Sequence, residues 1–142
     1  MGTELSAEDR KDLVSRIGKI PITDALKLRM GALERGSCTL EMDRDLRYNG
    51  IFDSIHGGIL ATLADSAAAF AILTVAGVTS RITTIDMSIR FLRPALGRVA
   101  AKARVVKAGK SVAFCAVDVE NEQGEIVADS AVTYMILREL PG

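Results

Sequence analysis

The apolar run from Gly57 to Leu73 has the pattern of a long helix buried in a protein core. Leucine and alanine recur along it at the three- and four-residue spacing of one helix face. Asp65 interrupts the longest weakly polar run, Ile59 to Val78, and Ala and Thr dilute it, so a buried helix explains it better than a membrane span. Most residues at this spacing are alanines, which let other elements pack closely around the helix. They are Leu60, Leu63, Ala64, Ala67, Ala68 and Ala71.

Alternating apolar and polar residues on both sides of this helix predict β-strands. Before the helix, strands are expected at 26–32 and 38–42, joined by a turn at 34–37. After it, strands are expected at 84–91, 99–105, 111–120 and 125–137, the last two joined by a hairpin turn at 121–124.

The strand at 84–91 shows the alternation most clearly. Because successive side chains of a strand point to opposite faces, the pattern predicts which residues share a side. One side is expected to carry Ile85, Met87, Ile89 and Phe91, and the other Thr84, Asp86, Ser88 and Arg90.

A short N-terminal helix is expected within residues 1–20. Ser6 to Asp9 has the form of a capping box, and Leu13, Val14 and Ile17 share one face behind it. Pro21 should end this helix, because proline has no N–H to continue the ladder. Residues 44–55 are expected to form an irregular loop.

The order of elements predicts a single α+β domain over residues 1–142, with the N-terminal helix in 1–20 and the central helix at 57–73. An antiparallel sheet of about six strands should wrap around the central helix and hold it on its concave face. The connections among the last four strands are short, which predicts an antiparallel meander.

Composition excludes several classes of function. The 18 basic and 18 acidic residues balance to a formal net charge of zero, whereas a dedicated nucleic-acid binder usually has a basic excess. The first residues have neither the basic nor the apolar region of a signal peptide, so a cytoplasmic protein is expected. Cys38 and Cys115 have no partner at a ligand spacing, so we expect structural thiols and no metal site.

The segment His56-Gly57-Gly58 stands at the predicted start of the central helix. The first N–H groups of a helix have no internal partner and lie at the positive end of its dipole, so they can polarise a carbonyl or bind an oxyanion. Glycine has no side chain to block that approach. Alternatively, the two glycines only permit a tight turn into the helix.

Asp65 is the one acid of the helical run and lies eight positions after Gly57. That separation is roughly 12 Å along a helix, so one carbonyl cannot touch both groups of the same helix. Two antiparallel copies of the helix would bring Asp65 of one subunit to Gly57 of the other, with two identical sites per dimer. The alternative is a helix-surface aspartate bonded to Thr62, Ser66 or water.

His56, the only histidine, has three interpretations: general base, metal ligand, or a residue that shapes the helix start. Without further ligands or a suitable Cys partner, a zinc site and a Cys–His dyad are excluded. Asn49 in the preceding loop could hold a water or a carboxylate, or simply make a turn.

These residues resemble the hotdog-fold acyl-CoA thioesterases, specifically the PaaI type of phenylacetic acid degradation. The resemblance covers nearly all of the chain after the N-terminal helix. Asn49 precedes His56 by seven positions where the family commonly has six, which indicates a one-residue bulge in the loop. The matching segments are Asn49, His56–Asp65, Thr84–Ile89, Leu92–Ala95 with Gly97, Ala108–Lys110, Gly124 and Val127–Ala128.

The resemblance implies a thioester hydrolase that releases a free acid and coenzyme A. Gly57 would polarise the thioester carbonyl, and Asp65 of the facing subunit would be the nucleophile or general base. His56 would support the oxyanion loop, Asn49 would orient the water or the aspartate, and Gly58 would line the substrate site. Thr84 matches a position that helps to place the nucleophile in some relatives.

The resemblance also implies an acyl-CoA substrate, no cofactor, no membrane partner, and a homodimer that forms a homotetramer. Arg93, Lys107 and Lys110 are candidates for binding the CoA phosphates. Phe52, Phe70 and Met87 either line an acyl pocket or pack in the core. Three alternatives are a non-catalytic acyl-CoA binding protein, a hotdog dehydratase or hydratase, and a purely structural oligomer. The acyl group is not determined.

Overall fold

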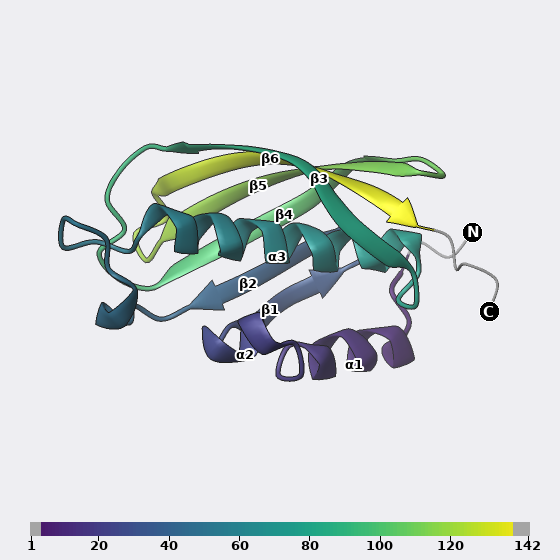
Figure 1. Ribbon diagram of the computed structural model, residues 1–142. Coiled ribbons are helices and arrows are strands. Elements are labelled where there is room, and N and C mark those ends of the chain that lie inside the picture. The colour runs from purple at the N-terminus through teal and green to yellow at the C-terminus, as the bar shows by residue number, and fades with distance from the viewer. Residues whose placement is uncertain (1–3, 138–142) are drawn as a thin grey trace.

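The computed structural model describes residues 4–137, which form one six-stranded antiparallel sheet that curves around the long helix α3 (Figure 1). The strand order is β1-β2-β4-β5-β6-β3, and the α+β fold class expected from the sequence is confirmed. The elements are α1 (Ala7–Arg16), α2 (Pro21–Ala25), β1 (Arg29–Glu34), β2 (Ser37–Met42), the 3-10 turn η1 (Leu46–Tyr48), α3 (Gly57–Ala76), β3 (Arg81–Phe91), β4 (Val99–Ala108), β5 (Val112–Asn121) and β6 (Ile126–Leu137).

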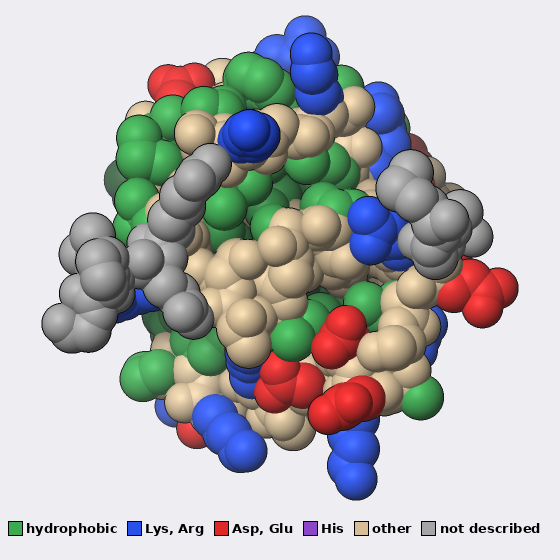
Figure 2. All heavy atoms as spheres, turned by 90° about the vertical axis from the view of Figure 1, so that its right-hand side faces the viewer, with side chains coloured by type: hydrophobic (Ala, Val, Ile, Leu, Met, Phe, Trp, Pro, Cys, Tyr) green, Lys and Arg blue, Asp and Glu red, His purple; other side chains and the backbone are tan. Residues whose placement is uncertain are grey.

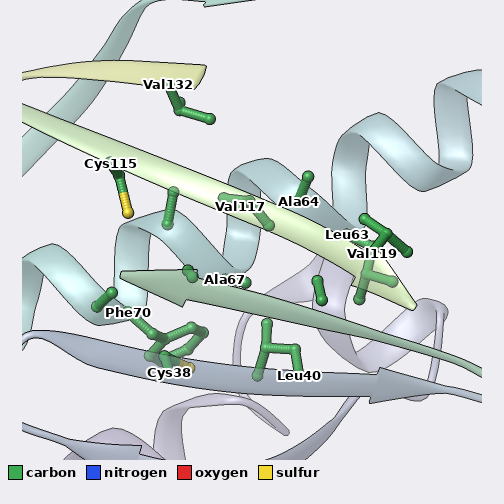
Figure 3. Packing of buried hydrophobic residues seen from close by; sticks show 14 of the residues in the cluster. Cys38, Leu40, Leu63, Ala64, Ala67, Phe70, Cys115, Val117, Val119 and Val132 are labelled. Atoms are coloured by element: carbon green, nitrogen blue, oxygen red, sulfur yellow. The ribbon is translucent and has the colours of Figure 1, made fainter. Parts of the chain in front are cut away.

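Helix α3 is the centre of the core and contacts all six strands. All six residues expected on its apolar face are buried, and they pack against inward residues such as Leu40, Val117 and Val132 (Figure 3). The helix continues three residues beyond the predicted end, to Ala76, and Gly77 ends it with a positive φ of 110°.

By length and composition α3 could cross a membrane, but half of its apolar stretch is buried inside this domain. Its small side chains explain the fit. Ala64, Ala67, Ala68 and Ala71 are fully buried, and they let the strands lie close to the helix axis.

The N-terminal segment forms two helices instead of one. Ser6 caps α1, its hydroxyl accepting a hydrogen bond from the Asp9 amide, as the capping box predicts. The predicted role of Pro21 is wrong. Helix α1 ends at Arg16, and Pro21 begins α2, where its missing N–H would have had no helical partner. Both helices lie beside β1 (Figure 1).

The first strand begins later than its alternation predicts. Leu26 and Leu28 are buried, but they precede β1, and Lys27 between them has a φ of 53° that no regular strand permits. The register of β1 on β2 shifts between Met30 and Leu33, which leaves Ala32 exposed. The second strand and the turn before it lie where they were expected.

The predicted meander of the last four strands is wrong for the first of them. Strands β4, β5 and β6 follow one another, but β3 pairs with β6 at the far edge of the sheet. Residues 92–98 carry the chain from that edge back to β4 in the sheet interior. Apolar alternation marks a strand but does not identify its neighbours.

The predicted sides of β3 are also wrong at its start. A β-bulge at Ile85 pairs Thr84 with Tyr134 and Asp86 with Thr133, so Ile85 is an extra residue without a partner. Thr84 consequently lies on the helix side with Met87 and Ile89, while Ile85 is exposed.

Cys38 and Cys115 are buried free thiols in the core, as their strand contexts predict (Figure 3). Burial raises the pKa of each thiol from 9.0 to about 12. Such thiols carry almost no thiolate at neutral pH, which fits a packing role.

Candidate active site

The start of α3 presents one main-chain donor that is free of internal partners. His56 is the N-cap residue, and its Nδ1 accepts a hydrogen bond of 2.9 Å from the Gly58 amide. The amides of Ile59 and Leu60 donate to the His56 carbonyl. Within residues 4–137 the Gly57 amide donates no hydrogen bond, so it remains available at the positive end of the helix dipole.

Gly57 and Gly58 lack side chains for different structural reasons. A Cβ on Gly58 would lie 3.0 Å from Nδ1 and Cε1 of His56, so a side chain there would force the capping imidazole to shift. A Cβ on Gly57 would lie 3.1 Å from Cζ of Phe91. Gly58 therefore accommodates the cap, while Gly57 leaves room beneath an aromatic ring.

A pocket of about 510 Å³ opens at Gly57. Its walls come from the loop before α3, from α3 itself, and from the segment after β3. The Phe52 side chain is 82 % exposed at this mouth, whereas Phe70 is buried in the core. The apolar lining consists of Phe52, Ile55, Leu60, Phe91, Leu92, Pro94 and Ala95. The other lining residues are Ser54, Gly57 and Arg93.

Asp65 is held by two hydroxyls from the sheet. Thr84 Oγ1 donates to Oδ1 of Asp65 at 2.8 Å, and the Tyr134 hydroxyl donates to the same oxygen at 2.6 Å. Among residues 4–137 no group donates to Oδ2. Asp65 is half-buried and is therefore not a free surface residue. Its carboxylate bonds to neither Thr62 nor Ser66, and the Thr62 hydroxyl donates to the Gly58 carbonyl instead.

Tyr134 is the site residue that sequence reasoning missed. Its ring is buried, and burial together with the Asp65 carboxylate raises the pKa of the phenol well above its ordinary value. Tyr134 is one of only two tyrosines and stands in an apolar strand, where a buried hydroxyl requires a partner. That requirement was the available signal.

Asn49 is fastened within its own loop. Its Nδ2 donates to Oδ1 of Asp53 at 2.9 Å, and the same carboxylate binds Arg44, which also donates to the Leu96 carbonyl. The loop closes through a bridge between Asn49 and Ile55. The Oδ1 atom of Asn49 is buried and has no hydrogen-bond partner in the described chain.

The candidate phosphate-binding residues lie at opposite ends of the domain. Arg93 lines the pocket at Gly57 and forms an ion pair with Glu125. Lys107 and Lys110 are exposed near the far end of β4, roughly 30 Å along that strand. Figure 2 views the end that faces right in Figure 1; it shows several Lys and Arg side chains and no histidine.

One chain therefore brings together Gly57, Gly58, His56 and Asn49 at the helix start, and Asp65 with Thr84 farther along the helix. Gly57 and Asp65 remain two helix turns apart, as their spacing predicts. Within residues 4–137 no cluster of three His, Cys, Asp or Glu side chains could hold a metal ion. The available chemistry is a helix amide, a carboxylate and two hydroxyls.

Comparisons with known proteins agree on one family. The sequence pattern of the thioesterase superfamily matches residues 52–128. The medium/long-chain acyl-CoA thioesterase YigI of Salmonella typhimurium is 29% identical, over 96% of this chain and 99% of the relative. Human acyl-coenzyme A thioesterase 13 is 32% identical, over 75% of this chain and 78% of the relative.

Solved structures share the fold. The E. coli PaaI protein from the phenylacetic acid degradation operon superposes with a TM-score of 0.86 at 23% identity, covering 94% of this chain and 96% of that one. A thioesterase family protein from Silicibacter pomeroyi superposes with a TM-score of 0.84 at 26% identity, covering 91% of this chain and 98% of that one.

Proposed function

This chain belongs to the thioesterase superfamily and is an acyl-CoA thioesterase, and we propose that Gly57 and Asp65 of facing subunits carry out the hydrolysis. The observation that carries this proposal is the unpaired Gly57 amide at the mouth of an apolar pocket. A donor in that position fits a thioester carbonyl whose oxygen gains negative charge during attack.

The hydrolysis needs a group that activates water or attacks the carbonyl carbon itself. As general base, Asp65 takes a proton from water while the water oxygen bonds to the carbonyl carbon. The C–S bond then breaks, and the CoA sulfur takes up the proton. As nucleophile, Asp65 bonds to the carbonyl carbon, and the C–S bond breaks to release CoA as a thiolate that takes a proton from solvent. The resulting mixed anhydride is hydrolysed by water in a second step, which frees the acid and restores Asp65. The unbonded Oδ2 suits either role.

A homodimer is the minimum unit in this proposal, because Gly57 and Asp65 of one helix lie too far apart for one thioester. Strand β3 supports it. It is an edge strand of 11 residues without proline, an open edge on which a second copy can pair. Antiparallel pairing about a two-fold axis brings the Thr84 end of one β3 toward the Phe91 end of the other, and so Asp65 toward the facing Gly57.

The remaining groups have supporting roles. His56 holds the first turn of α3 by capping it, which keeps the Gly57 amide directed into the pocket. Asn49 orients the water, whose O–H can donate to the unpaired amide oxygen Oδ1. Gly58 allows the cap, and Thr84 orients Asp65.

The CoA portion crosses the dimer in this scheme. Arg93 of one subunit and Lys110 of the other lie at the same end once β3 pairs with its copy, and their charges suit phosphates. We further propose that two dimers form a homotetramer, that the enzyme is cytoplasmic, and that it needs no cofactor.

Hydrolysis of a panel of aryl, medium-chain and long-chain acyl-CoA esters tests the function and identifies the acyl group. The wild-type protein should release CoA thiol from at least one ester. Asp65→Asn should reduce kcat on that ester by about 10²- to 10⁴-fold without loss of fold. Unchanged turnover in Asp65→Asn would eliminate the proposed chemistry. Label from H₂¹⁸O found in Asp65 after one turnover identifies the nucleophile route.

A further inference from the structure

We propose that Tyr134 is a positioning residue that selects which oxygen of Asp65 does the chemistry. The inference rests on the proposed function of Asp65. It concerns β6, an element that the reaction scheme above does not use. The Tyr134 hydroxyl lies 2.6 Å from Oδ1 of Asp65 and 2.8 Å from the main-chain oxygen of the same residue.

Burial and strand pairing fix the position of the Tyr134 hydroxyl. Tyr134 is 4 % exposed, and its strand neighbour in the sheet is Thr84, the second donor to Oδ1. The β-bulge at Ile85 brings Thr84 onto this side. Two hydroxyls from adjacent strands thus converge on one carboxylate oxygen.

A carboxylate needs such restraint because its terminal torsion is soft. The χ2 angle of aspartate has a broad distribution, so the two oxygens exchange positions readily when nothing binds them. With Oδ1 held from two directions, Oδ2 keeps one position relative to a bound thioester. Small errors in that position are costly in rate, because attack requires near-contact geometry.

The charged surroundings of the cluster are sparse. Cys115 on β5 lies on the same side of the sheet as Tyr134, and both groups are neutral at pH 7, because burial raises further a pKa that already lies above 7 in each. Among residues 4–137 no Lys or Arg forms an ion pair with Asp65; the donors that face it are Tyr134 from β6 and Thr84 from β3. The phenol therefore stays a proton donor over the whole assay range.

The test is Tyr134→Phe, which keeps the buried ring and removes only the hydroxyl. We expect kcat to fall about 10- to 100-fold, the range for a hydrogen bond to a charged group, with KM little changed. The acidic limb of the pH profile of kcat/KM should move to higher pH, because an ionised carboxylate that has lost a donor binds its proton more tightly.

Tyr48→Phe is the matched control. Tyr48 is the other tyrosine, and its hydroxyl makes only a long contact of 3.5 Å with the Ala25 carbonyl. This variant should leave kcat and the pH profile unchanged. A purely structural Tyr134 would lower the thermal midpoint of the Phe variant and leave the pH profile in place, which would overturn the inference.

Incorporation of 3-fluorotyrosine into Tyr48→Phe protein provides a second test that does not depend on the Phe variant folding. The fluorinated phenol is a stronger donor of nearly the same shape, so the acidic limb should move to lower pH. An unmoved limb would contradict the proposal. If wild-type protein hydrolyses no acyl-CoA ester, the proposed function is wrong. That result is distinct from an active wild-type protein whose acidic limb does not respond to Tyr134, which contradicts only the role of Tyr134.

Discussion

The ring of Phe91, at the end of β3, fills the space that a side chain on Gly57, at the start of α3, would occupy. A Cβ placed on Gly57 would stand 3.1 and 3.2 Å from two atoms of that ring. Both residues line the same pocket. Phe91 belongs to β3, the edge strand on which we place the second subunit. The close packing therefore brings the free amide of Gly57 next to the proposed subunit interface.

We predict that Gly57→Ala lowers kcat/KM by about tenfold. This is less than the 10²- to 10³-fold loss on removing an oxyanion donor, because the amide remains while the displaced ring narrows the pocket. Steady-state kinetics measures the effect. Gly18→Ala is the control, since a Cβ there meets nothing within 4 Å. Equal kcat/KM for Gly57→Ala and Gly18→Ala would show that the packing has no role in catalysis.

A mixture of Asp65→Asn and Gly57→Leu proteins should regain activity that neither variant has alone. Random exchange makes half of the dimers mixed, and each mixed dimer has one intact site, so activity approaches about a quarter of wild type. Subunit exchange is verified by native mass spectrometry, and each variant alone serves as the blank. Complete exchange with no recovered activity would rule out a site shared between subunits.

Gly58→Ala should stabilise the fold only when His56 is removed. Alanine is favoured over glycine in a helix by up to about 1 kcal/mol in either background. With His56 present, the added Cβ displaces the capping imidazole, and the loss of the cap, about 1 kcal/mol of the free energy of unfolding, offsets that gain. In His56→Ala protein there is no cap to lose, so the gain remains. Urea unfolding of the four proteins measures this coupling. An equal change in the free energy of unfolding in both backgrounds would mean that His56 and Gly58 act independently.

Alkaline pH should destabilise the fold through the two buried thiols. Burial raises the pKa of Cys38 and Cys115 from 9.0 to about 12, so between these values the unfolded chain releases protons that the folded protein retains. The thiols therefore do not lower the free energy of unfolding below pH 9. As pH rises from 9 toward 12, the free energy of unfolding falls by about 1.4 kcal/mol per pH unit for each thiol.

Urea unfolding at a series of pH values from 8 to 11 measures that slope. Cys38→Ala/Cys115→Ala protein is the comparison, because lysines and tyrosines titrate in both proteins and cancel. The double variant should be less stable at pH 8 yet lose less stability as pH rises. Parallel pH dependence in the two proteins would contradict the assigned thiol burial.

Most elements could be predicted because their signals are local. The helical spacing of leucine and alanine identified α3, and the turn at 121–124 marked the hairpin before β6. The helix-start motif likewise located the free amide and the cap. Pro21 was misjudged because a proline disfavours a helix interior and favours a first turn, and the sequence does not distinguish the two.

The errors in β3 have a different origin. Its alternation continues unbroken from Thr84 to Arg90, and a bulge inserts one residue without any change in that pattern. The position of β3 beside β6 could not be predicted either, because the alternation of side chains along a strand does not say which strand pairs with it. Tyr134 could not be linked to Asp65 while the strand order was unknown.

By itself the sequence determined the six strands, the central helix with its buried face, and the separation of Gly57 from Asp65 along that helix. These follow from residue periodicity and from the fixed rise of a helix. The tertiary structure alone decided that Thr84 and Tyr134 meet at Asp65, and that Phe91 covers Gly57. Such contacts join residues far apart in the chain, and the order and register of the strands, which no local pattern encodes, bring them together.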